Sequence, residues 1–207
     1  MTRIYLVRHG TTDWNKEEIF RGRAECPLNE TGKAEGKALA AYFEDVPLAG
    51  IYSSPLSRAM ETARPTAESK GREVVPDPAF TDLDFGTWQG LPLKEAKEKY
   101  PDLYRLWREQ PGVVSFPRGE NLTQVRSRTW EGLLRLAEGN PQRTILIVTH
   151  RVVTKVLICA ALGLNHSHFW QVKQDSTAIN CFEYSRGNFQ IALINDTCHL
   201  KKIKTSV

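Results

Sequence analysis

Among the charged and titratable side chains of this 207-residue chain, five are placed where they could form one reactive site. They lie in four segments that are far apart in the sequence. Arg8 and His9 directly follow an apolar run that predicts a strand, and His150 ends a later run of the same kind. Arg58 lies one turn into the helix predicted after the strand-like sequence GIYSS, and Asp82 lies in the loop TDLDFGTWQG. Because ligands of open α/β sheets bind beyond the carboxyl ends of the strands, we expect these side chains to meet at one edge of a sheet.

Two arginines and two histidines around one cavity suit a dianionic phosphate group. The planar guanidinium of arginine matches phosphate oxygens in a bidentate way and stays charged at neutral pH. Nearby guanidinium charges favour a neutral imidazole with a free lone pair, and such a ring could act as nucleophile, phosphate donor or general acid. A second histidine and the arginines would stabilise the transferring phosphoryl group, and a carboxyl group could protonate the leaving alcohol. The pattern therefore predicts phosphoryl transfer.

Each of these residues alone also has an ordinary structural explanation. The tripeptide RHG is short enough to occur by chance at a strand end, and His150 could be a hydrogen-bonded core histidine. Arg58 could pair with Glu61, which lies three residues further along the same predicted helix. The joint placement of four such segments, three of them directly after a predicted strand, favours a shared site.

Predicted strands and helices alternate along the chain. Strands are expected at Arg3–Val7, Gly50–Ser53, Glu73–Val75, Thr144–Thr149, Ala178–Tyr184 and Phe189–Ile194. Helices are expected in GKAEGKALAAYFED, LSRAMETARPTAE and LTQVRSRTWEGLLRLAE and at Val152–Leu162, and the second of them opens at Ser54-Pro55. This alternation predicts an α/β fold with helices on both faces of the sheet and one domain over residues 1–207. The less regular segment from about 81 to 119 is expected to be an insertion over the active edge.

Composition and patterning argue against several classes of protein. The net charge of +4 and the lack of a dense basic stripe argue against nucleic acid as a partner. No apolar run of about eighteen residues predicts a membrane-spanning helix, and no signal-peptide pattern is present, so we expect a cytoplasmic protein without a membrane partner. The four cysteines include no CxxC pair and are expected to be free thiols, and no residues have metal-ligand spacing. The basic tail LKKIK is expected to be a solvated C-terminus.

The motifs together resemble the histidine phosphatase superfamily, in its phosphoglycerate-mutase-like branch. The resemblance covers nearly the whole chain and depends on segments that stand in the family's order: LVRHGTTDWN, FRGRAECPLNETGKAEGKALA, IYSSPLSRAMETA, LDFGTWQG, FPRGENLTQVRSR and IVTHRVVTKVL. It implies a three-layer α/β/α sandwich with a mixed, mainly parallel central sheet and an α-helical insertion over the active edge. It also implies chemistry that needs no metal and no other cofactor.

The resemblance implies a role for each residue at a matching position. His9 corresponds to the nucleophile that becomes phosphohistidine, and Arg8 and Arg58 correspond to the phosphate clamp. His150 would complete the pocket and stabilise the transition state, and Asp82 occupies the position of the proton donor. The residues implied to contact phosphate or substrate are Asn15, Thr11, Thr12, Arg21 and Gly22.

Two positions depart from the family's pattern. The proton donor is an aspartate where this branch usually has glutamate, and Asp84, two residues further on, stays a weaker alternative to Asp82. Arg151 replaces the glycine that commonly follows the distal histidine. If Arg21 and Arg151 face the pocket, they favour a substrate with a second negative group; otherwise they are solvated surface arginines.

These features predict a phosphomonoesterase that acts on a small phosphorylated metabolite. The short segment between Asp82 and Asn121 resembles that of the short phosphatases rather than that of the longer cofactor-dependent phosphoglycerate mutases. The segments LGLNHSHFWQVKQDSTAIN and LINDTCHL resemble bacterial α-ribazole phosphatases and metal-independent phosphoserine phosphatases. α-Ribazole 5′-phosphate and phosphoserine are therefore the leading substrate candidates. The alternatives are a mutase and a non-catalytic member that binds phosphorylated ligands, and the sequence is compatible with a homodimer.

Overall fold

A six-stranded sheet forms the centre of the protein, for which a computed structural model describes residues 1–201. Its strands are β1 (Thr2–Arg8), β2 (Leu48–Ser53), β3 (Val75–Pro76), β4 (Thr144–Thr149), β5 (Ile179–Ser185) and β6 (Asn188–Asp196). They lie in the order β3-β2-β4-β1-β5-β6; the pairs among the first four strands are parallel, and β5 is antiparallel to both its neighbours. The sheet is therefore mixed and mainly parallel, which confirms the prediction. Most of the predicted solvated tail belongs to residues 202–207, outside the described residues.

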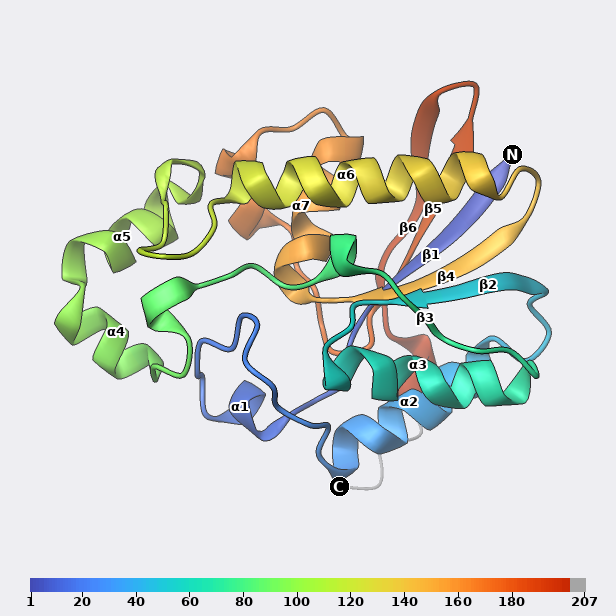
Figure 1. Ribbon diagram of the computed structural model, residues 1–207, viewed down its shortest axis with the longest axis horizontal. Coiled ribbons are helices and arrows are strands. Elements are labelled where there is room, and N and C mark those ends of the chain that lie inside the picture. Colours follow the sequence, from blue (N-terminus) through green and yellow to red (C-terminus); the bar gives the residue numbers. More distant parts are fainter. Residues whose placement is uncertain (202–207) are drawn as a thin grey trace.

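Helices cover both faces of this sheet (Figure 1). They are α1 (Asp13–Lys16), α2 (Glu30–Tyr42), α3 (Ser57–Ser69), α4 (Leu93–Lys99), α5 (Pro101–Glu109), α6 (Leu122–Gly139) and α7 (Arg151–Ala161). α2 and α3 pack against each other on one face, and α6 and α7 pack against each other on the other. This three-layer α/β/α arrangement confirms the predicted fold class. Within residues 1–201, no helix is both long and apolar enough to cross a membrane.

Alternate residues of β1 face two separate apolar layers, as expected for a strand that is buried on both faces. Ile4 and Leu6 belong to the apolar cluster that includes residues of α6 and α7, whereas Tyr5 and Val7 belong to the cluster of α2 and α3. The side chains of Ile4, Leu6 and Val7 are fully buried. Burial of each such side chain contributes roughly 1.5–3 kcal/mol. The two layers therefore hold β1 in one orientation.

The parallel pairing of β1 with β4 sets the position of two of the predicted site residues. Arg8 lies opposite Thr149, so His9 and His150, which follow them, leave the sheet at the same edge. The backbone N–H of His9 donates a hydrogen bond to the Thr149 carbonyl at 2.8 Å. α7 begins immediately beyond this edge, at Arg151.

The insertion between β3 and α6 contains α4 and α5 and lies at one end of the molecule, near α1 (Figure 1). Phe85, Trp107 and Phe116 pack edge to face within the same apolar cluster as α6 and α7. Backbone hydrogen bonds also join residues 90–93 of the insertion to residues 18–20, in the loop after α1. The insertion is therefore helical, as predicted, and it is fixed to both the core and the N-terminal loop.

Most of the predicted strands and helices begin or end one to three residues away from the observed ones, and two of these differences have a local explanation. α3 begins at Ser57 rather than directly after Ser54-Pro55, because the N–H of Ser54 still donates to the Val148 carbonyl of the sheet at 2.9 Å. β3 covers Val75–Pro76 rather than Glu73–Val75. It is an edge strand, and an edge tolerates proline, which has no N–H to donate.

The close approach of α2 to the loop after β1 provides a test of stability. A Cβ atom added at Gly32 would overlap the Thr11 carbonyl, whereas one added at Gly36, in the same helix, would meet no atom closer than 3.5 Å. We expect Gly32→Ala to lower the free energy of unfolding by about 1–3 kcal/mol, because the backbone beside His9 must shift. Gly36→Ala, the matched control, should raise it by roughly 0.5–1 kcal/mol through helix propensity. Urea unfolding measures both, and equal stability of the two variants would contradict this packing.

Candidate active site

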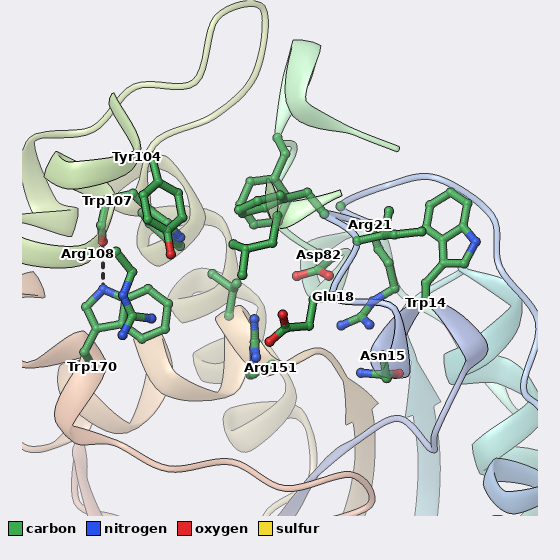
Figure 2. A pocket seen from close by; sticks show the side chains of 16 residues that line it. Trp14, Asn15, Glu18, Arg21, Asp82, Tyr104, Trp107, Arg108, Arg151 and Trp170 are labelled. Carbon is green, nitrogen blue, oxygen red and sulfur yellow. Dashed lines mark hydrogen bonds between the residues drawn. The ribbon is translucent and has the colours of Figure 1, made fainter. Parts of the chain in front are cut away.

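A pocket of about 210 Å³ opens at the carboxyl edge of the parallel strands, beside the insertion (Figure 2). Its walls come from α1 and the following loop, from the loop after β3, from α5, and from the start of α7. The polar side chains that line it include Asn15, Arg21, Asp82, Tyr104 and Arg151. Arg21 and Arg151 thus both line the pocket. This is the arrangement for which the sequence predicted a substrate with a second negative group.

His9 is fully buried, and its ring lies beside that of His150, with the two ring centroids 5.2 Å apart. Its Nδ1 lies 2.7 Å from the Gly10 carbonyl oxygen. A carbonyl oxygen only accepts hydrogen bonds, so Nδ1 carries the ring proton and Nε2 keeps its lone pair. Nε2 has no hydrogen-bond partner among the described residues. The structure therefore presents His9 in the tautomer that a nucleophile requires.

Arg58 and Arg8 are held by backbone carbonyl groups. The Arg58 guanidinium, fully buried, donates to the carbonyls of Ala24 at 2.9 Å and Gly22 at 2.6 Å. Arg8 donates to the Gln174 carbonyl at 2.8 Å. Neutral carbonyl oxygens orient these cations without neutralising them. Arg58 also donates to the Asp82 carboxylate, at 3.5 Å.

Further guanidinium donors remain without a partner in the part of the chain that the structure describes. They are the buried Nε atoms of Arg8, Arg21 and Arg58. Buried polar groups are normally hydrogen-bonded, and an unpaired one costs free energy. A phosphate group carries enough acceptor oxygens to satisfy donors of this kind. The cluster is therefore suited to bind an anion.

His150 and Asp82 lie next to each other at this cluster. The Nε2 of His150 lies 2.7 Å from the Ser54 hydroxyl, which itself accepts a hydrogen bond from the Leu56 N–H. With the hydroxyl donating to Nε2, the ring proton is on Nδ1, which faces the Asp82 Oδ2 at 3.7 Å. Asp82 Oδ2 also lies 3.5 Å from Arg58 Nη2. The carboxyl group thus lies where it can reach a group bound against His150.

Of the two aspartates in this loop, Asp82 lines the pocket and Asp84 does not. Asp84 accepts a hydrogen bond from the Gly86 N–H at 2.8 Å and lies 3.7 Å from Arg23 Nη1. Its side chain therefore holds the loop together. The Asp82 carbonyl is fixed in turn by Arg128 Nη2 at 3.0 Å, which sets the direction of the loop.

Burial changes the proton affinities of the arginines. Together with the charges of Arg151 and Arg21, it lowers the pKa of Arg8 to about 9, and it lowers the pKa of Arg21 to about 10. Both remain protonated at neutral pH. Their mutual repulsion is relieved when a dianion binds among them.

Burial and the Arg58 guanidinium lower the pKa of His9 well below 6.5, and the same causes lower the pKa of His150. Both rings are therefore neutral at pH 7. A neutral His9 with a free Nε2 lone pair, surrounded by guanidinium charges, is an arrangement that can accept a phosphoryl group.

The remaining predicted residues have different positions. The Asn15 Oδ1 accepts hydrogen bonds from the N–H and the hydroxyl of Thr12 at 3.0 and 2.8 Å, and Asn15 lines the pocket. The N–H and hydroxyl of Thr11 donate to the Glu35 carboxylate at 2.7 and 3.0 Å. Gly22 lines the pocket with φ +52° and supplies the carbonyl that holds Arg58. Thr11 and Thr12 therefore shape the loop rather than the pocket wall.

The structure also places in the pocket or beside it residues that the sequence did not single out. Ser54 holds His150, and Glu18 and Arg108 line the pocket. Trp170 also lines it. Ser54 lies in the segment IYSSPLSRAMETA, but its role depends on the contact with His150, and Glu18 and Arg108 lie outside the six segments that carry the resemblance. Among residues 1–201, no three His, Cys, Asp or Glu side chains gather to hold a metal ion.

The chain belongs to the histidine phosphatase superfamily (branch 1), whose sequence model matches residues 4–197. This confirms the resemblance of the motifs. Phosphoserine phosphatase 1 of Hydrogenobacter thermophilus is 34% identical over 200 residues, which cover 97% of this chain and 95% of that protein. The family and this relative identify the chain as a phosphatase enzyme.

Solved structures share the fold. YhfR of Bacillus stearothermophilus has a TM-score of 0.94 and 30% identity, and the match covers 97% of this chain and 100% of that one. A phosphoserine phosphatase variant from Entamoeba histolytica, in complex with phosphoserine, has a TM-score of 0.86 and 26% identity over 97% and 100% of the chains. The α-ribazole phosphatase of Shigella flexneri, with a TM-score of 0.85 and 24% identity over 94% and 96%, shows the fold alone.

The low pKa of His9 predicts how stability depends on pH. In the unfolded chain, His9 takes up a proton near pH 6.5, whereas in the folded chain it does so only at a much lower pH. Between these two pH values the unfolded state binds more protons than the folded state. Stability is therefore complete above about pH 6.5 and falls below it, by up to about 1.4 kcal/mol per pH unit for each such histidine. We expect His9→Gln to reduce this fall, measured as urea unfolding free energies between pH 7 and pH 5. The control is His168→Gln, which changes a partly exposed histidine outside the pocket. If the unfolding free energy of His9→Gln fell with pH as steeply as that of the wild type, the prediction would be contradicted.

Proposed function

We propose that this chain is a metal-independent phosphomonoesterase that hydrolyses a small phosphorylated metabolite through a phosphohistidine on His9. The observation that carries the proposal is the His9 ring: neutral, with its Nδ1 proton bound to the Gly10 carbonyl and its Nε2 lone pair unpartnered beside Arg8 and Arg58. The family and its phosphatase relatives support the reaction class.

In the first half-reaction, His9 Nε2 attacks phosphorus and the bond to the ester oxygen breaks. Arg8, Arg58 and His150 stabilise the charge on the equatorial oxygens as the phosphoryl group moves. Asp82 donates its proton to the ester oxygen, so the substrate leaves as a neutral alcohol. The products of this step are the alcohol and phosphohistidine.

In the second half-reaction, water attacks the phosphohistidine from the position that the alcohol has left. The Asp82 carboxylate, deprotonated by the first step, takes a proton from this water. The bond between phosphorus and Nε2 breaks, and its electron pair returns to the ring. Inorganic phosphate leaves and Asp82 is protonated again.

Phosphoserine is the substrate that the observations favour. The relative at 34% identity carries the name phosphoserine phosphatase, whereas the likeness to an α-ribazole phosphatase concerns the fold. The pocket volume of about 210 Å³ lies below the range of about 300–1,000 Å³ that is usual for drug-sized ligands, which suits a compact ester. α-Ribazole 5′-phosphate, with its nucleoside-like bulk, is the second candidate.

We expect phosphate release from phosphoserine in the presence of excess chelator, at a rate far above that for α-ribazole 5′-phosphate and 3-phosphoglycerate. His9→Ala should reduce kcat by at least about a thousandfold, because it removes the nucleophile. A phosphate-release assay over this panel, with acid-labile phosphoprotein trapped by rapid quenching, measures both effects. Strict dependence on added Mg²⁺ would contradict the proposed chemistry. Phosphate binding without turnover would favour a non-catalytic member, and transfer between two phosphoglycerates would favour a mutase.

The role of Asp82 gives a second prediction. Asp82→Asn should lower kcat for phosphoserine by about a hundredfold or more, because its alkoxide leaving group needs a proton. The loss should be much smaller for a nitrophenyl phosphate, whose leaving group is already stable as an anion. Asp84→Asn is the matched control, since its carboxylate is bound to the Gly86 N–H. An equal loss for both esters in Asp82→Asn would show that Asp82 is not the proton donor.

A further inference from the structure

Two oppositely charged side chains of the pocket are not used by the phosphate chemistry. Glu18 and Arg151 both line the pocket, and their side chains are exposed to it. In the described part of the chain, neither side chain takes part in a hydrogen bond or an ion pair. Their charges are therefore available to a ligand that occupies the pocket.

The backbone holds Glu18 in a conformation that a non-glycine residue rarely adopts. Its φ is +53°, in the left-handed region, which costs roughly 1–3 kcal/mol unless the surroundings impose it. The surroundings do so here: the Glu18 carbonyl accepts a hydrogen bond from the Leu93 N–H at 3.0 Å, and Ile19 pairs with Pro92 in an isolated bridge. The insertion thus fixes the backbone from which the Glu18 carboxylate enters the pocket. Strain of this kind is typical of residues that bind a ligand.

Arg151 is a cation of the outer pocket whose guanidinium has no hydrogen bond or ion pair within the described residues. It is the first residue of α7 and directly follows His150, so it lies next to the reacting groups. Arg108 also lines the pocket, but its guanidinium stacks on the Trp170 ring at 4.3 Å. Trp170 is fixed in turn by a hydrogen bond from its Nε1 to the Trp107 carbonyl at 2.7 Å.

We infer that Glu18 and Arg151 form a subsite for the ammonium and carboxylate groups of a phosphorylated amino acid; this rests on the proposed function. With the phosphate among Arg8, Arg58 and His9 and the ester oxygen at Asp82, the leaving alcohol extends into the pocket that Glu18 and Arg151 line (Figure 2). A carboxylate and a guanidinium that do not pair with each other are complementary to a zwitterion. Glu18 would bind the ammonium group, and Arg151 would bind the carboxylate.

This subsite attracts a zwitterionic ester, and it also disfavours esters that lack one of the two charged groups. An ester with a hydroxyl in place of the ammonium group leaves Glu18 without a cation and beside the ligand's own carboxylate. An ester without the carboxylate leaves Arg151 unpaired. A hydrogen bond between two charged groups is worth more than one between neutral groups, so each missing group should cost about tenfold in affinity or more.

Four small esters test the proposal because they carry the two groups in every combination. Phosphoserine has both, phosphoethanolamine has only the ammonium, 3-phosphoglycerate has only the carboxylate, and glycerol 3-phosphate has neither. We expect Glu18→Gln to lower the ratio of kcat/KM for phosphoserine to that for 3-phosphoglycerate about tenfold. Arg151→Gln should lower the ratio for phosphoserine to that for phosphoethanolamine by a similar factor.

Matched control variants separate the subsite from general effects of charge. Glu17→Gln changes the neighbouring exposed carboxylate, which does not line the pocket. Arg105→Gln changes an exposed arginine of α5 that lies near Asp102 and Glu109. Both controls should leave the two ratios unchanged. Ratios that stay constant in Glu18→Gln and Arg151→Gln, or a change in only one of the two, would overturn the paired subsite.

A binding measurement keeps this test separate from that of the proposed function. In a His9→Ala background, calorimetry gives the affinities for phosphoserine and 3-phosphoglycerate without turnover, and binding of inorganic phosphate shows that the inner site is intact. A preference for phosphoserine that Glu18→Gln removes would support the subsite even if the wild-type protein hydrolysed none of the esters. Rapid hydrolysis of all four esters at similar rates, with similar affinities, would keep the phosphatase and reject the subsite.

Discussion

The parallel register of β1 against β4 is the constraint on which the rest of the site depends. It brings His9 and His150 to one edge of the sheet, with ring centroids 5.2 Å apart. Both rings are fully buried and each has one hydrogen bond that orients it, to the Gly10 carbonyl and to the Ser54 hydroxyl. The packing of β1 side chains into two different layers holds this register, because a slip of one residue would exchange the layers that they face.

The burial of several positive charges at this edge is costly, and the structure offsets only part of that cost. Arg8 and Arg58 donate to backbone carbonyl groups, which orient them but carry no net charge. Asp82 is the carboxylate nearest to Arg58. The site therefore gives up some stability so that a dianionic ligand finds oriented donors, as is usual where function and folding make opposite demands.

The insertion links the inner phosphate site to the outer part of the pocket. Its aromatic residues pack into the same core as α6 and α7, so it is not a loosely attached loop. The first loop of the insertion supplies Asp82, and the Leu93 N–H of the insertion donates to the carbonyl of Glu18, which has a left-handed conformation. In the proposed mechanism, the groups assigned to the phosphate come from the sheet edge, whereas those assigned to the leaving alcohol depend on how the insertion packs. Substrate choice can thus change without change to the reacting groups.

The sequence alone determined the α/β fold class and most strand positions, and it predicted that His9, Arg8, Arg58 and His150 lie together, because apolar periodicity marks strands and ligand-binding residues follow strand ends. It favoured Asp82 over Asp84, which lies in the same loop, but the hydrogen bond that Asp84 accepts from the Gly86 N–H is a feature of the folded loop.

The tertiary structure alone likewise decided that Arg21, Arg151 and Glu18 line the pocket. Each depends on contacts between segments far apart in the chain, such as the bond from the Leu93 N–H to the Glu18 carbonyl. Local sequence patterns do not predict such contacts, because the direction of a side chain at the pocket depends on the packing of the whole fold rather than on its neighbours in sequence.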